Sequence, residues 1–216
     1  MRRELIVFTQ ALLLVFLLQS VCYGQFPLTQ QELHKLRRLS AASVSPDGTK
    51  VAYQIRTWDE KTNKVANHIE ITSTNGGGAL YVTQSKFGVS DSSPVWSPDS
   101  KGIAFLSTRS GSSQIWYVNL SDLTTLAQVS DYPVDVTSFK WPEHTNFIVF
   151  TADVYPDCAD LTCTANRDTA VAARGENTGF VYDQLFVRHW DTWATGKLSH
   201  VFIQGISSGG RCPVGE

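Results

Sequence analysis

The sequence predicts an all-β fold: a partial β-propeller of about three blades, preceded by a signal peptide and a short helix. The first observation is a ten-residue phrase that occurs three times, each time as a proline-containing turn followed by an apolar strand. The second is the period, because Pro46, Pro98 and Pro142 lie 52 and 44 residues apart. Repeats of roughly 40–50 residues that contain several short strands are typical of propeller blades.

The phrase has the chemistry of a tight turn that leads into a strand. In the first copy, residues 44–53, the proline fixes φ, Asp47 accepts local backbone hydrogen bonds and Gly48 tolerates positive φ. Alternating apolar residues follow the turn and predict a strand. The second copy is residues 96–105, and the third, diverged copy is residues 141–150. A chance turn would explain one copy, whereas three copies in matching hydrophobic contexts predict a repeat.

Residues 1–24 are predicted to be a secretory signal peptide. Arg2 and Arg3 precede an apolar run over residues 5–18, and small residues lie just before Gln25. A retained membrane anchor is the alternative, but the run is short for a bilayer span. We therefore expect a secreted protein, or one in the lumen of the secretory pathway, with no membrane contact after signal cleavage.

The charge balance excludes several classes of partner. The chain has 18 Lys and Arg against 20 Asp and Glu, which gives a net charge of −2. This balance provides no basic surface for nucleic acid or anionic membrane. The glycine triplet at residues 76–78 lacks the Lys-Ser or Lys-Thr pair of a phosphate-binding loop, so it predicts a flexible turn. No cofactor and no metal are expected.

A lead-in helix is predicted within residues 25–42, before the first blade. Thr29 is a good N-cap, Glu32 lies three residues later as in a capping box, and Leu33, Leu36 and Leu39 recur at helical spacing over residues 28–39.

Residues 43–204 then divide into three blades, near 43–83, 94–130 and 137–204, by their strand and turn signals. The third blade contains a long polar insertion, residues 154–179, without clear periodicity. Connections of this length are often functional, and disorder is the alternative. Residues 205–216 are predicted to be a divergent tail.

Three cysteines remain after signal cleavage. Cys158 and Cys163 are predicted to form a disulfide in an oxidising compartment. Buried thiols are the alternative, and a metal site is disfavoured because no histidine pair lies nearby. Cys212 is left unpaired or pairs with a cysteine outside this chain. Asn119 begins an Asn-Leu-Ser sequon and is a candidate glycosylation site.

Two further stretches carry a family resemblance. Residues 182–193, Tyr-Asp-Gln-Leu-Phe-Val-Arg-His-Trp-Asp-Thr-Trp, and residues 196–202, Gly-Lys-Leu-Ser-His-Val-Phe, resemble secreted peptidases of the dipeptidyl-peptidase V type in the prolyl oligopeptidase family of serine peptidases. The resemblance covers most of residues 26–204. It implies an N-terminal propeller that shields an α/β-hydrolase domain, a Ser, Asp and His triad in that domain, and release of dipeptides from small peptides. We expect this chain to end before the catalytic domain.

One motif match is judged to be a coincidence. Residues 205–209, Gly-Ile-Ser-Ser-Gly, fit the nucleophile elbow with Ser207 as the nucleophile. In an α/β-hydrolase a helix follows the elbow, and the Asp and His partners come later in the chain. Only seven residues follow Gly209, and they include neither Asp nor His. No catalytic residue is therefore expected in this chain.

Arg188, His189, Asp191 and Trp193 have two interpretations. Such residues commonly form a hydrogen-bond network inside a blade, and this interpretation is favoured. The alternative is a substrate-gating site at the mouth facing the hydrolase, where Asp191 would bind a peptide amine and Arg188 a peptide backbone. Besides the propeller portion of an exopeptidase, the sequence allows a non-catalytic secreted binding module or an inactive truncated product.

Overall fold

The computed structural model describes residues 28–84, 86–175, 179–183, 185, 187–207 and 210–211. The predicted signal peptide lies outside these residues. A first unit, which extends to Leu36, contains helix α2 (Gln30–Lys35), where Thr29 Oγ1 accepts a hydrogen bond from Glu32 N at 3.2 Å. The predicted helix over 28–39 was too long, because residues 38–44 form a strand. No residue of α2 is buried, and a short helix without tertiary burial is only marginally stable.

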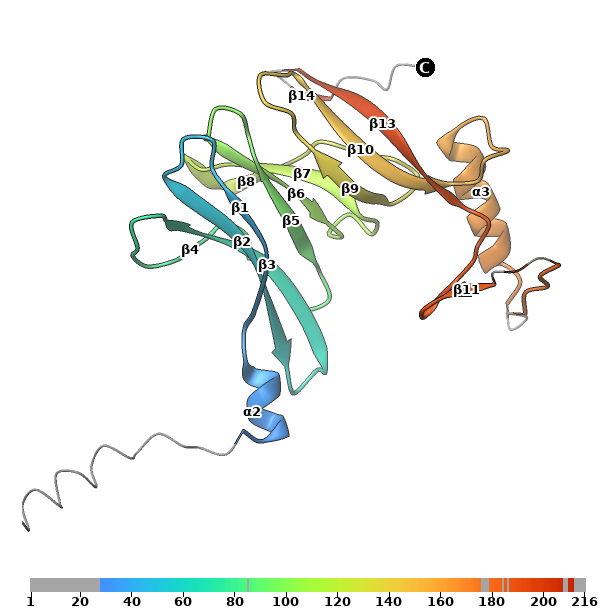
Figure 1. Ribbon diagram of the computed structural model, residues 1–216, viewed down its shortest axis with the longest axis horizontal. Helices are drawn as coiled ribbons and strands as arrows, with labels where there is room; N and C mark the ends of the chain where they lie inside the picture. Colours follow the sequence, from blue (N-terminus) through green and yellow to red (C-terminus); the bar gives the residue numbers. More distant parts are fainter. Residues whose placement is uncertain are drawn as a thin grey trace, which may run out of the picture. The chain divides into compact units, whose positions relative to one another are not determined.

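The described part of the second unit, which begins at Arg37, contains three four-stranded antiparallel sheets (Figure 1). In each sheet the strands follow one another in chain order, so the predicted all-β fold is confirmed. Sheet A contains β1 (Arg38–Val44), β2 (Lys50–Asp59), β3 (Lys64–Ser73) and β4 (Leu80–Tyr81). Sheet B contains β5 (Asp91–Trp96), β6 (Gly102–Ser107), β7 (Gln114–Asn119) and β8 (Asp122–Gln128). Sheet C contains β9 (Val136–Lys140), β10 (Phe147–Val154), β13 (Leu198–Ser207) and β14 (Gly210–Arg211).

Sheet B packs against both other sheets, and its strand β6 is therefore buried along its whole length. Side chains alternate along a strand, so Ile103 and Phe105 join the core shared with sheet A, whereas Ala104 and Leu106 join the core shared with sheet C. Trp96 adds a polar link between sheets A and B, since its Nε1 donates a hydrogen bond to Ser43 O at 2.9 Å. Successive sheets are thus joined by apolar cores on opposite faces.

The three copies of the repeated phrase adopt the same turn. The residue after the acidic position has positive φ in each copy: Gly48 at 71°, Ser100 at 59° and His144 at 58°. Glycine adopts this conformation without steric cost, and the other two residues do not. In the second copy Ser100 Oγ accepts a hydrogen bond from Asp47 N at 3.1 Å, which joins the turns of two neighbouring sheets.

A long insertion separates β10 from β13 in sheet C. It starts at Tyr155 and ends at Lys197, and the two strands pair directly at its base, where Val154 lies opposite Leu198. The insertion contains helix α3 (Leu161–Ala172) and a hairpin of β11 (Arg188–His189) and β12 (Thr192–Trp193), drawn in orange to red in Figure 1. The sequence predicted no regular structure over 154–179. The helix was missed because it is rich in small and polar residues and buries only Thr164.

Candidate functional site

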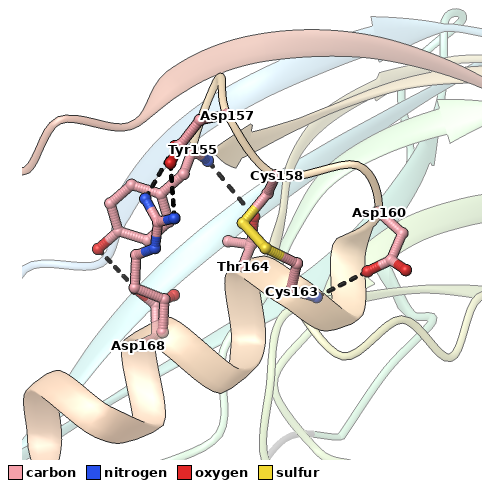
Figure 2. The surroundings of a disulfide bond; sticks show 8 residues. Tyr155, Asp157, Cys158, Asp160, Cys163, Thr164 and Asp168 are labelled. Atoms are coloured by element: carbon pink, nitrogen blue, oxygen red, sulfur yellow. Dashed lines mark hydrogen bonds and ion pairs between the residues drawn. A yellow bond between two sulfur atoms is a disulfide. The ribbon is translucent and has the colours of Figure 1, made fainter.

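A disulfide lies where the insertion leaves sheet C (Figure 2). Cys158 follows β10, Cys163 lies in the first turn of α3, and their Cα atoms are 5.5 Å apart. Asp160 caps the same turn, since its Oδ1 accepts a hydrogen bond from Cys163 N at 2.7 Å. The side chain of a residue at this position satisfies an amide that has no partner within the helix. The disulfide and the cap together fix the start of α3.

An ion pair holds the second turn of α3 to the same loop. Arg167 donates two hydrogen bonds to Asp157, at 2.8 and 2.7 Å, in the bidentate geometry that suits guanidinium and carboxylate. These hydrogen bonds lower the pKa of Asp157. The guanidinium of Arg167 also lies 4.4 Å from the ring centre of Tyr155, a cation–π contact.

Three residues, here called the insertion base, connect both ends of the insertion to α3. They are Tyr155, Asp168 and Lys197. Asp168 Oδ1 accepts a hydrogen bond from Tyr155 Oη at 3.3 Å, and Lys197 Nζ lies 3.2 and 3.0 Å from the two carboxylate oxygens of Asp168. The pKa of Tyr155 is raised, first by burial and then by the negative charge of Asp168. One helix residue thus contacts the first and the last residue of the insertion.

The β11–β12 hairpin and the segment just before it carry five residues, here called the arm: Phe180, Tyr182, Arg188, Asp191 and Trp193. Tyr182 is half-buried and the other four are exposed. The Tyr182 and Trp193 rings are stacked with centres 6.4 Å apart, and the Arg188 guanidinium lies 5.3 Å from the Trp193 ring centre. Tyr182 Oη donates a hydrogen bond to Ala194 O at 3.0 Å, which ties the incoming segment to the hairpin. Arg188, His189, Asp191 and Trp193 are all exposed.

The expectation that these four residues form a network inside a blade was wrong. β11 pairs with β12 alone in a two-stranded sheet, and this hairpin belongs to the insertion rather than to one of the three large sheets. A two-stranded hairpin has no second layer of strands to bury its side chains. The turn also places Trp190, a bulky residue, at a φ of 53°, a conformation that costs energy and is concentrated at functional sites.

The other predicted residues lie apart from the arm. Asn119 is exposed at the end of β7, and its Oδ1 accepts hydrogen bonds from Ser121 N and Ser121 Oγ at 2.9 and 2.8 Å. Ser207 lies in β13 and pairs with Gly210 of β14, so the first described residues after the elbow-like motif form a strand. Cys212 lies outside the described residues.

Sequence reasoning missed a buried carboxylate on sheet A. Glu70 is 2% exposed and bonds to Arg37, to Tyr53 Oη at 3.2 Å and to His68 Nε2 at 3.1 Å. His68 stacks on Tyr81 and lines a cavity of about 340 Å³ together with Thr57, Ala66, Thr83, Gln84 and Phe87. The sequence feature that could have revealed this site is Glu70 itself, because an acidic residue lies between two isoleucines, Ile69 and Ile71, in a strand.

The part of the chain that the structure describes contains neither a candidate metal site nor a candidate membrane-spanning helix. Within it, no three His, Cys, Asp or Glu residues are grouped so that they could hold a metal ion. No helix there has the length and apolar character needed to cross a bilayer.

Comparison with known proteins gives relatives among peptidases. No family model matches the chain. Dipeptidyl-peptidase 5 of Porphyromonas gingivalis is 29% identical over 84% of this chain, and dipeptidyl-peptidase 5 of Porphyromonas endodontalis is 27% identical over 83%. These alignments cover 25% and 24% of the relatives, so the chain spans about a quarter of their length.

Solved structures of peptidases share the fold. The AtxE2 isopeptidase has a TM-score of 0.59 at 18% identity, with 88% of this chain and 32% of that chain covered. Pyrococcus horikoshii acylaminoacyl peptidase also has a TM-score of 0.59 at 18% identity, with 83% and 25% covered. Over most of its length the chain is therefore a homologue of the dipeptidyl-peptidase 5 proteins, with the propeller-type fold found in peptidases of the prolyl oligopeptidase family.

Proposed function

We propose that the chain is the substrate-gating propeller portion of a secreted serine exopeptidase that releases dipeptides from the N-termini of small peptides. The homology to dipeptidyl-peptidase 5 supports the reaction class. The disulfide supports a secretory location, since disulfides persist in oxidising compartments. The exposed arm, with a carboxylate, a guanidinium and aromatic rings on one short hairpin, is the observation that carries the gating role.

The arm has the groups that recognition of a peptide N-terminus requires. Asp191 offers a carboxylate to a protonated amine, Arg188 offers donors to peptide carbonyls, and Trp193 offers an apolar face to a side chain. Asp191 lies in the hairpin turn, between the two strands that carry the other groups. We assign no catalytic residue to this chain, and we propose that its 216 residues bind peptide without hydrolysing it.

Substitution of Asp191 tests the gating role. With Asp191→Asn, the affinity for a tetrapeptide with a free N-terminus should fall about tenfold, which corresponds to about 1.4 kcal/mol for a charge-assisted hydrogen bond. Fluorescence anisotropy of a C-terminally labelled tetrapeptide measures the change. Asp153→Asn is the matched control, because Asp153 is an exposed carboxylate on β10, outside the arm.

The outcomes separate two functions. An N-acetylated tetrapeptide should bind the wild-type chain as weakly as the free tetrapeptide binds the Asp191→Asn variant. If the free and the acetylated peptide bind equally well, the proposal that the arm recognises the amine is wrong. That result would favour a non-catalytic binding module instead.

A further inference from the structure

The insertion leaves and re-enters sheet C at one point, and its helix contacts both ends. Tyr155 follows the last residue of β10, Lys197 precedes the first residue of β13, and Asp168 of α3 bonds to both side chains. The backbone at Gly196 lies near the same ring, because a Cβ built there would lie 4.0 Å from Tyr155 Cε1. One carboxylate therefore connects the sheet, the helix and the segment that returns from the arm.

The position of α3 itself is fixed by a few contacts at its N-terminal half. Thr164 is its one buried residue, and Thr164 Oγ1 accepts a hydrogen bond from Tyr155 N at 3.3 Å. The disulfide, the Asp160 cap and the Asp157–Arg167 pair hold the same half. A helix of 12 residues is marginal by itself in water, so these contacts determine where Asp168 lies.

Lys197 connects Asp168 of α3 to the segment that returns from the arm. It lies three residues after Ala194, whose N donates a hydrogen bond to Val187 O at 2.9 Å and whose O accepts from Tyr182 Oη. These two hydrogen bonds close the base of the hairpin that carries Arg188 and Trp193. The side chain of Lys197 is 25% exposed and that of Asp168 is 41% exposed, so the pair is partly shielded from water. Salt screens a partly buried ion pair less than a fully exposed one.

We propose that Asp168 is a positioning residue for the arm: through Lys197 and Tyr155 it fixes the direction in which the β11–β12 hairpin leaves sheet C. Asp168 itself does not contact peptide. The part of this inference that concerns peptide recognition rests on the proposed function, whereas the part that concerns the order of the arm does not.

Hydrogen exchange measured by mass spectrometry on the full chain tests the inference. With Asp168→Asn, amides of the hairpin, Ala194 among them, should exchange at least tenfold faster, because the lysine loses its charged partner. Amides of β10, such as Phe150, should keep their wild-type rates. Asp168→Glu, which retains the carboxylate, should restore much of the protection, and Asp153→Asn should have no effect. Lys197→Met, which keeps most of the length of the side chain but removes its charge, should reproduce the result of Asp168→Asn.

The readouts separate this inference from the proposed function. Hairpin exchange that is unchanged in both Asp168→Asn and Lys197→Met would overturn the positioning role, whatever the peptide affinity. If β10 also loses protection in Asp168→Asn, the residue acts on the fold as a whole, and the inference then stands only if Lys197→Met loosens the hairpin alone. Faster hairpin exchange with unchanged tetrapeptide affinity would support the positioning role and contradict the gating function of the arm.

Discussion

At the scale of single residues, one serine defines each of the first two repeated turns. Ser45 Oγ donates to Asp47 Oδ1 at 2.6 Å and accepts from Lys50 N at 2.9 Å, and Ser97 makes the same bonds to Asp99 Oδ1 and Gly102 N. Both serines are 3% exposed. The hydrogen bond from Ser45 is the main reason that the pKa of Asp47 falls from 3.8 to about 2.

Ser45→Ala should therefore raise the pKa of Asp47 toward 3.8. Because the folded-state pKa lies below the unfolded value, this carboxylate stabilises the fold above about pH 4, and its contribution is lost as the pH falls toward 2. The variant should lose the part of this acid-range stabilisation that comes from the Ser45 hydroxyl, whereas the part that comes from the hydrogen bonds of Thr49 should remain. Titration of the Asp47 carboxyl carbon by NMR measures the change, and a midpoint that stays near 2 would refute this explanation.

The sequence predicted these turns because proline, aspartate and glycine act locally. It did not predict why Gly102 occupies the position that Lys50 has in the first copy. A Cβ on Gly102 would lie 2.1 Å from Tyr117 Oη, so the ring of Tyr117 requires a glycine there. Nor did it predict the bond from Asp47 N to Ser100 Oγ. Both depend on contacts between residues distant in the chain.

At the scale of elements, the helices were the least predictable parts. Leucines at helical spacing extended the predicted lead-in helix to residue 39, yet Leu39 pairs with Ile55 in sheet A. For α3 the reverse holds, because local capping and a disulfide support a helix that has little apolar periodicity. In the lead-in segment, strand pairing outweighs the helical spacing of the leucines. In α3, the disulfide and the cap support a helix that the hydrophobic pattern does not predict.

Replacing both cysteines with serine should loosen α3 selectively. A loop this short gains about 2 kcal/mol from closure by a disulfide. Amides near the start of α3, such as Cys163 N, should exchange roughly tenfold faster or more, and the amides of β6 should not change. If the rates throughout α3 match those of the wild type, the remaining contacts, among them the Asp160 cap and the Asp157–Arg167 pair, hold the helix without the disulfide.

The residue types of the arm drew attention to it in the sequence, but its position in an exposed hairpin outside the three large sheets was not predicted. Arg188, Asp191 and Trp193 stood out because charged and aromatic residues alternate over a few positions. The same alternation suits a buried strand and an exposed hairpin, and sequence alone favoured the buried strand. The decisive fact is that β10 pairs directly with β13, which places the segment between them outside the sheets.

At the scale of the whole molecule, one face of sheet C carries apolar side chains that no other described strand covers. Val201 is 69% exposed and Ile203 is 64% exposed, and both point to the same face of β13. The cores between sheets A and B and between sheets B and C show how such faces are normally buried in this protein. Repeat units of this kind bury their faces against neighbouring units.

Expressed alone, residues 25–216 should therefore be marginally stable and should self-associate. Val201→Thr together with Ile203→Thr, which keeps β-branched residues on the strand, should shift the distribution toward monomer. Sedimentation velocity at several concentrations measures the effect, and Asp153→Asn again serves as the surface control. A monodisperse wild-type monomer with one sharp, cooperative unfolding transition would contradict this prediction.

We propose that this chain binds peptides through their free amine and leaves them intact. Native mass spectrometry of the purified chain with a tetrapeptide tests it most directly. We predict a complex with the mass of the chain plus the intact tetrapeptide, weaker for the N-acetylated peptide. Release of a dipeptide that is lost with Ser207→Ala, or equal complexes with both peptides, would contradict it.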